Sequence, residues 1–210
     1  MKEIFPSIYL LRPESSGPNT PYTYLLKRAA GNILFATKAD VTPVLDEIRA
    51  LGGVTQIFLG DRHHALAHTL ELAKQLGAPI SCSDVEAAVL KKQGVVIDTP
   101  LPLRRTQFAP DLELIPTPGH TRGAFSYLWK NQGRRFLFIG DTLVPVDGAW
   151  QYWVTKPNRA TMRETVSTLA ALSFDVILSN SFASTPMAWL EADASYRKSM
   201  FAALAADFTD

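Results

Sequence analysis

A chain of mixed strands and helices is predicted by the order of strand-like and helix-like segments and by the glycine and proline residues that separate them. The chain has 210 residues, of which 47% are hydrophobic. This length and this content suffice for one substantial core, which predicts a single domain over residues 1–210. We find no internal repeat or low-complexity linker that would divide it.

The first segments are predicted to form an antiparallel meander followed by a helix. Residues 4–11, 22–26 and 32–36 are rich in β-branched and aromatic side chains, and proline, glycine and serine separate them. Residues 41–51 carry apolar side chains at spacings of three and four and end at a Gly-Gly pair, which predicts an amphipathic helix.

Strands and helices then alternate. The helix predicted over residues 65–76 stops at Gly77, and its period places Leu66 on the face toward the core. Ser83 is predicted to cap the helix over residues 84–91. The remaining predicted strands cover residues 54–59, 79–81, 95–97, 112–116, 124–130, 134–139 and 176–178, with a polar strand after residues 99–102 and helices over residues 163–172 and 193–207.

Composition excludes several classes of function. The formal net charge is +1, so no broad positive field favours nucleic acid. No apolar run approaches the roughly 20 residues that cross a bilayer, and the N-terminus has no apolar signal region. Cys82 is the only cysteine, which excludes an intramolecular disulfide and a thiolate zinc cluster. We therefore expect a soluble, cytoplasmic protein that binds neither nucleic acid nor membrane.

Two loops carry side chains that can bind a metal. Pro116-Thr117-Pro118-Gly119-His120-Thr121 follows one predicted strand, and Phe138-Ile139-Gly140-Asp141-Thr142 follows another. Three of the four histidines of the chain lie in the segment from His63 to His68, and the fourth is His120. Imidazole and carboxylate donors together suit zinc, iron or manganese.

These loops resemble those of the metallo-β-lactamase superfamily, where a Thr-Pro-Gly-His-Thr turn and a Gly-Asp turn supply metal ligands. The resemblance implies an α+β fold, a four-layer αββα sandwich of two mixed β-sheets, and the order of the predicted elements is consistent with it. The family's main loop, Thr-His-Xaa-His-Xaa-Asp-His, corresponds to residues 60–66. Here Asp61 replaces the first histidine, His63 keeps the second, and Ala65 and Leu66 replace the final pair. Ser181 stands where the family has a late histidine.

The resemblance implies a degenerate centre, because three expected ligands are missing. Asp61, His63, His120 and Asp141 could hold one divalent ion, with Asp141 in the catalytic role of completing the metal shell or accepting a hydrogen bond from water. Slow hydrolysis of a small molecule is then expected. Alternatively, the two histidines pair with Asp61 and Asp141 without metal, and the protein is a non-catalytic binding or assembly protein. A redox role for a single iron is a third hypothesis.

Other side chains near these loops have two interpretations each. Trp150, Tyr152 and Trp153 lie in an insert-like stretch after Asp141, where they either stack on an apolar substrate or fix the loop to the domain or to a second copy in a homodimer. His64 and His68 are four residues apart, which fits a weak metal pair or solvated helix-start residues. Residues 181–186 are expected to form the opposite rim of the cleft.

Overall fold

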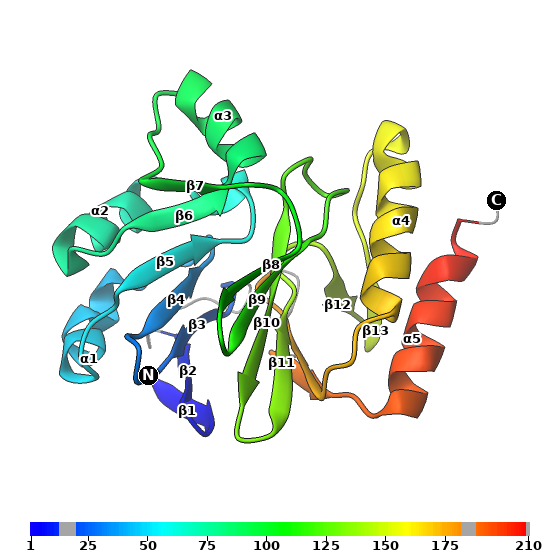
Figure 1. Ribbon diagram of the computed structural model, residues 1–210, viewed down its shortest axis with the longest axis horizontal. Coiled ribbons are helices and arrows are strands. Elements are labelled where there is room, and N and C mark those ends of the chain that lie inside the picture. Colours follow the sequence, from blue (N-terminus) through cyan, green and yellow to red (C-terminus); the bar gives the residue numbers. More distant parts are fainter. Residues whose placement is uncertain (13–19, 182–187, 209–210) are drawn as a thin grey trace. The chain divides into compact units, whose positions relative to one another are not determined.

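The structure is a computed structural model that describes residues 1–12, 20–181 and 188–208. Within it the chain forms two compact units, Met1–Pro102 and Leu103–Asp210. Each unit is built around one large mixed β-sheet (Figure 1). In the part of the chain that the structure describes, none of the helices has the length and apolar character that a membrane crossing requires.

The first unit has a seven-stranded sheet in the sequential order β1 to β7. Its first four strands pair antiparallel, and the last four pair in parallel. The predicted meander is present, but the single strand predicted over residues 4–11 is divided between β1 and β2, because the chain turns at Ser7, whose φ is 66°. Because successive parallel strands lie side by side, right-handed crossovers place α1, α2 and α3 on one face (Figure 1). The bounds are β1 Lys2–Phe5, β2 Ile8–Leu11, β3 Thr23–Leu26, β4 Ile33–Ala36, α1 Leu45–Ala50, β5 Gln56–Leu59, α2 Ala67–Leu76, β6 Ile80–Ser83, α3 Asp84–Lys92 and β7 Thr99–Leu101.

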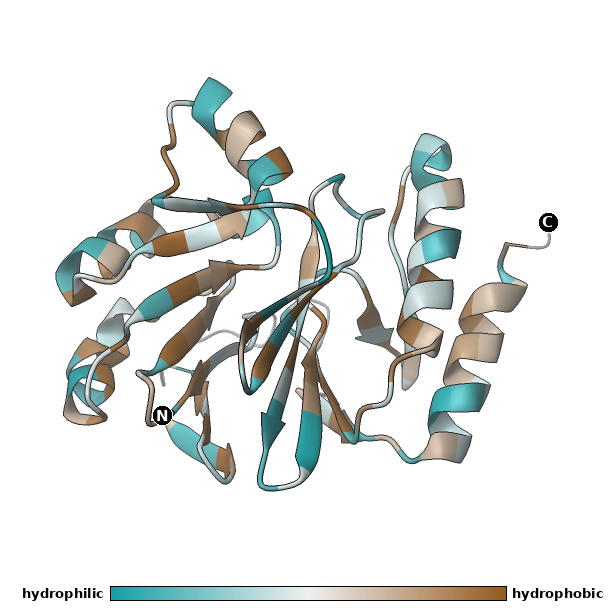
Figure 2. Cartoon of the chain, in the orientation of Figure 1, coloured by the Kyte–Doolittle hydropathy of each residue, from teal (hydrophilic) through white to brown (hydrophobic). Residues whose placement is uncertain are grey.

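Alternate residues of the central strands build the core of the first unit. Leu34 and Ala36 of β4 and Ile57 and Leu59 of β5 pack in one cluster with residues of α1 and α2. Figure 2 shows the hydrophobic character of β4 and β5. Because alternate side chains of a strand point to the same face, these residues all face the helices. A slip of one residue would turn them to the other face, so their burial fixes the register of the sheet.

The second unit has a six-stranded sheet in the order β15-β14-β11-β10-β9-β8 and a separate two-stranded hairpin. Helices α4 and α5 pack with the sheet in one cluster that includes Ile139, Met162 and Phe201. The bounds are β8 Thr106–Ala109, β9 Leu112–Pro116, β10 Phe125–Asn131, β11 Arg134–Phe138, β12 Val144–Val146, β13 Ala149–Gln151, α4 Arg159–Ala170, β14 Val176–Leu178, β15 Trp189–Glu191 and α5 Ala194–Ala206.

The strand predicted over residues 95–97 is wrong. The Val95 N–H donates to the Leu90 carbonyl at 3.0 Å, and Gly94 has a φ of 83°. This is a glycine C-cap of α3, so the backbone that would start a strand ends the helix instead. The strand β7 begins later and contains Pro100, which an edge strand tolerates because one side of its backbone needs no partner.

The prediction that Leu66 faces the core is also wrong, because its side chain is 38% exposed. Leu66 has extended backbone angles and precedes α2 as its N-cap residue. The helix therefore begins at Ala67 and buries Thr69, Leu72 and Ala73. A shift in the start of a helix changes the face on which a flanking residue lies.

The hairpin β12–β13 is an element that the sequence-based prediction missed. Val144 pairs with Gln151 and Val146 with Ala149. Asp147 and Gly148 both have positive φ, 50° and 81°, as a type I′ turn requires. An Asp-Gly pair between two short apolar segments was therefore the available signal.

Candidate metal centre

Asp61 and His63 belong to the first unit and lie in the loop after β5. Asp61 is the N-cap residue of the short 3-10 helix Arg62–His64, and its Oδ1 accepts a hydrogen bond from the His63 N–H at 2.7 Å. The Nδ1 of the His63 ring lies 3.4 Å from the same oxygen. The Asp61 side chain is buried, with 1% of its surface exposed. The loop thus holds a carboxylate and an imidazole together.

An ion pair that the sequence did not predict fixes this loop to α3. The Nη1 of Arg62 donates to both carboxylate oxygens of Glu86, at 3.0 and 3.3 Å. Glu86 is fully buried in the first turn of α3, whose N-cap residue Ser83 accepts from the Glu86 N–H as predicted. Arg62 lies between Asp61 and His63, so its ion pair with Glu86 fixes this loop to the first turn of α3.

Cys82 lies beside this loop but is not a ligand candidate. Burial, together with the carboxylates of Glu86, Asp61 and Asp84, raises the pKa of its thiol to about 12. A thiol of this kind stays protonated near neutral pH, whereas metal binding requires the thiolate. Cys82 is therefore a structural residue.

His120 and Asp141 belong to the second unit, and the structure brings their side chains together. The Nε2 of His120 lies 3.9 Å from the Oδ2 of Asp141. The Nδ1 of the same ring lies 3.0 Å from the carbonyl oxygen of Trp153. A carbonyl oxygen can only accept, so Nδ1 carries the proton and the Nε2 of the neutral ring presents its lone pair.

The loop that carries His120 is fixed by close packing against α4. Gly119 has a φ of 146°, and a Cβ atom at this position would lie 2.7 Å from Cε of Met162. The Asn158 side-chain amide donates to the Gly119 carbonyl at 3.0 Å. Only glycine combines this backbone angle with this approach, which explains the glycine before the histidine.

The loop that carries Asp141 is fixed by buried polar contacts. The Oγ1 of Thr142 donates to Oγ1 of Thr117 at 3.0 Å. The Gly140 N–H donates to Oδ1 of Asn180 at 3.3 Å. The loops that follow β9, β11 and β14 therefore meet within the second unit.

The chemistry of these donors fits a divalent ion. Two atoms bound to one zinc at about 2.0–2.2 Å lie about 3–4 Å apart, and the separation between His120 and Asp141 falls in this range. The Nδ1 bond of His120 to a backbone carbonyl is the outer contact that metal-ligating histidines characteristically make. Each of the four candidates, Asp61, His63, His120 and Asp141, offers one nitrogen or oxygen ligand atom.

The structure separates the remaining predicted site residues into different roles. His64 lies in the short 3-10 helix and His68 in α2, so they do not form a pair on one helix. Trp150 is buried in the core, and the Tyr152 ring stacks on Phe208. Trp153 remains 40% exposed. Ser181 is buried, and residues 182–186 of the predicted rim lie outside the described residues.

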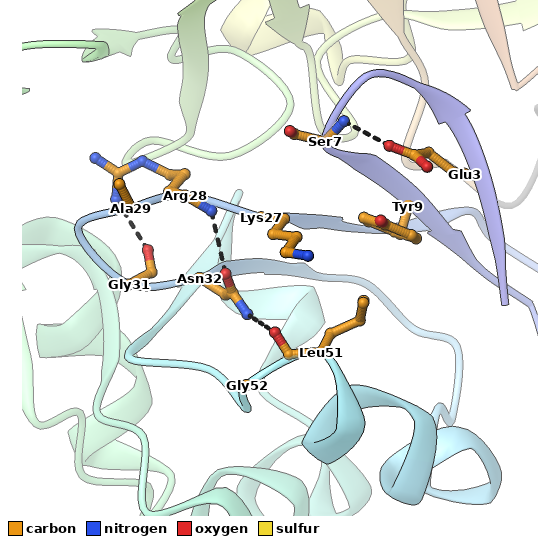
Figure 3. A pocket seen from close by; sticks show the side chains of 10 residues that line it. All are labelled: Glu3, Ser7, Tyr9, Lys27, Arg28, Ala29, Gly31, Asn32, Leu51 and Gly52. Carbon is orange, nitrogen blue, oxygen red and sulfur yellow. Dashed lines mark hydrogen bonds between the residues drawn. The ribbon is translucent and has the colours of Figure 1, made fainter.

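The first unit also contains a surface hollow of about 530 Å³ that includes none of the four ligand candidates. It lies between the β1–β2 turn and the loop before β4, where Lys27 and Arg28 bring positive charge (Figure 3). The Asn32 side chain bridges the loop by accepting from the Arg28 N–H and donating to the Leu51 carbonyl. These contacts give Asn32 a structural role.

Solved structures share this fold, although no protein-family model and no curated protein sequence matches the chain. A metallo-β-lactamase of Cronobacter sakazakii with a HARLDQ motif has a TM-score of 0.64 and 20% identity, over 85% of this chain and 76% of that chain. The subclass B3 enzyme BJP-1 of Bradyrhizobium japonicum has a TM-score of 0.64 and 19% identity, over 96% and 89%. The di-zinc enzyme LRA-12 from an Alaskan soil metagenome has a TM-score of 0.61 and 21% identity, over 83% and 75%.

The resemblance seen in the loops around His120 and Asp141 is thereby confirmed at the level of the fold. Two large mixed sheets with helices agree with the predicted α+β class. At about one fifth sequence identity, shared structure does not carry activity from one protein to another. The chain has the metallo-β-lactamase fold.

Proposed function

We propose that this protein is a slow, mononuclear metal-dependent hydrolase in which Asp61, His63, His120 and Asp141 hold one divalent ion. The observation that supports it most strongly is the orientation of His120. Its Nδ1 donates to the Trp153 carbonyl, which leaves the Nε2 lone pair toward Asp141. Metal-ligating histidines almost always donate their other ring N–H to such an acceptor.

Zinc is the first ion to test. Imidazole and carboxylate donors suit it, and the LRA-12 enzyme of the same fold is described as di-zinc. Ala65 and Leu66 provide no ligand atom, so we propose that a second ion is not held. The HARLDQ motif of the Cronobacter lactamase also departs from the family pattern, at its third and sixth positions, whereas this chain keeps His63 at the third.

When bound, the ion lowers the pKa of a water molecule and polarises the carbonyl or phosphoryl oxygen of a substrate. Asp141 would complete the shell of the ion or accept a hydrogen bond from the water molecule, which makes it the candidate catalytic residue. Asp61 brings a negative charge where the family has a neutral histidine, and this charge weakens the acidity that the ion can impart. The absence of a carboxylate at Ala65 removes the usual group that orients water, so we expect low turnover.

A second candidate function is a metal-free binding or assembly protein on the same fold. The contact that favours it is the cap at Asp61, whose Oδ1 already accepts from the His63 N–H. This bond would hold the loop in place without an ion. A homodimer and a cytoplasmic location remain part of the proposal in either case.

Elemental analysis of untagged protein, purified without chelators and then loaded with excess zinc, distinguishes the two functions. We expect about one zinc per chain, lost in the His63→Ala/His120→Ala double variant. His68→Ala is the matched control, since it removes a histidine outside the ligand set. Equal zinc in all three samples, or none in wild type, would contradict the proposal. Retained zinc in wild type then justifies screening ester, phosphodiester and thioester substrates.

A further inference from the structure

The segment that orients His120 is held from the far end of the chain. Trp153, whose carbonyl accepts from His120, directly follows Tyr152. The Tyr152 ring stacks on the Phe208 ring with centroids 4.8 Å apart and planes within 2° of parallel. Phe208 follows the last turn of α5. Its ring contacts Tyr152, and Tyr152 directly precedes Trp153, whose carbonyl contacts His120.

A second set of contacts fixes Phe208 itself. The Arg159 guanidinium lies over the Phe208 ring, 5.6 Å from its centroid, and its Nη2 donates to the Asp207 carbonyl. Arg159 is the first residue of α4, and the neighbouring Asn158 donates to the carbonyl of Gly119. The start of α4 therefore contacts both the end of α5 and the loop that carries His120. Figure 1 shows α4 and α5 beside the β12–β13 hairpin.

Stacking, and not a polar bond, holds Tyr152. Its hydroxyl is buried and has no hydrogen-bond partner among the residues that the structure describes. Burial raises the pKa of this phenol, and the nearby Asp207 carboxylate raises it further, so the ring stays neutral. The hydroxyl can thus be removed without loss of the contact to Phe208, whereas the ring cannot.

We infer that Tyr152 and Phe208 are positioning residues for His120. They fix the segment that ends in the Trp153 carbonyl, which keeps the proton on Nδ1 and presents Nε2 toward Asp141. Neither side chain supplies a ligand atom to the candidate centre. The expected effect of these two rings on metal affinity rests on the proposed function. Their effect on the tautomer of His120 does not, because the tautomer is a property of the metal-free protein.

The test measures the tautomer of His120 by nitrogen–proton NMR correlation of the imidazole rings in metal-free protein, at a pH where the ring is neutral. A His120→Gln sample assigns the signal. We expect the Nδ1–H form alone in wild type, and a mixture with the Nε2–H form in Tyr152→Ala and in Phe208→Ala. Phe208→Leu keeps apolar volume at this position without the aromatic stack. It replaces Phe208→Ala if that variant does not fold, and we expect the same mixture of tautomers.

Two control variants separate positioning from general stability. Tyr152→Phe keeps the stacked ring and should keep the pure Nδ1–H form. Tyr196→Ala removes an aromatic ring at the start of α5, where it packs on the same core, and should leave the tautomer unchanged even where it lowers the melting temperature. A pure Nδ1–H form in the Tyr152→Ala and Phe208→Leu variants would overturn the inference.

Zinc titration then tests the consequence for the proposed centre. Loss of an outer contact to a metal-bound histidine weakens the affinity for the metal by about 10- to 100-fold. We expect a loss of zinc affinity of this size in Tyr152→Ala and none in Tyr152→Phe. If wild type binds no zinc, the proposed function fails, while the NMR result still decides whether these two rings position His120. Unchanged affinity in Tyr152→Ala, with zinc bound in wild type, would contradict the inference.

Discussion

The Asp61–His63 pair and the His120–Asp141 pair each follow the end of a strand, yet different contacts fix them. In the first pair the carboxylate accepts a backbone N–H, and the ion pair between Arg62 and Glu86 holds the loop. In the second pair a backbone carbonyl orients the histidine. The first pair is therefore fixed by a local cap and by one ion pair to α3, whereas the histidine of the second pair is oriented by a backbone carbonyl 33 residues away.

For the proposed centre, this difference means that contacts other than metal ligation fix both loops. Ala65 and Leu66 supply no ligand atom, but the loop before them is still fixed by a cap and a buried ion pair. The second pair retains the outer contact that a bound metal uses. A change at Asp61 should thus affect stability as well as metal binding, while a change near Trp153 should affect mainly the orientation of His120.

The largest effect is expected from Arg62→Ala, which removes the cation beside the buried Glu86 carboxylate. Loss of one partner of a buried pair lowers the free energy of unfolding by about 3 kcal/mol or more. Urea denaturation followed by circular dichroism measures it. The double variant Arg62→Met/Glu86→Leu replaces both charges and should lose less than Arg62→Ala. A loss below about 0.5 kcal/mol for Arg62→Ala would show that the pair does not fix the loop.

A smaller effect is expected from Gly119→Ala in the loop of the second pair. The positive φ and the contact with Met162 together should lower the free energy of unfolding by about 2 kcal/mol. Gly133→Ala is the matched control. Its φ is 78°, and no atom lies within 4 Å of the added Cβ, so only backbone strain of about 1 kcal/mol remains. Equal losses in the two variants would mean that α4 does not constrain the His120 loop.

The smallest effect on stability is expected at Asp61. Asp61→Ala removes the cap of the Arg62–His64 helix and should lower the free energy of unfolding by about 1 kcal/mol. Asp61→Asn keeps an oxygen that can accept the His63 N–H, so its stability should stay near wild type while its zinc affinity falls. If Asp61→Asn lost as much stability as Asp61→Ala, the charge and not the cap would hold this loop.

Sequence patterns predicted the parts of the molecule that depend on local contacts. The strand before His120 was predicted with the bounds that β9 has, and β14 was predicted with its observed bounds as well. Ser83 was identified as a cap because the residue type and its position before a helix suffice. The strand predicted over residues 95–97 failed because the cap that uses the Val95 N–H was not recognised.

Contacts between distant residues could not be predicted from one sequence. The Trp153 carbonyl is 33 residues from His120, and a backbone acceptor leaves no signature in residue type. Arg62 and Glu86 are 24 residues apart, and each alone resembles a solvated charge. Of Trp150, Tyr152 and Trp153, only Trp153 is an exposed large hydrophobic residue, and the stack of Tyr152 on Phe208 joins residues far apart in the sequence.

X-ray absorption at the zinc edge, on protein loaded with one equivalent of zinc, tests the central claim most directly. The account predicts one ion with two imidazole nitrogens, from His63 and His120, and carboxylate oxygens for the remainder. It predicts no scattering from a second metal at about 3.5–4 Å. Zinc with no imidazole scattering, or with a second metal at that separation, would contradict a single centre built from Asp61, His63, His120 and Asp141.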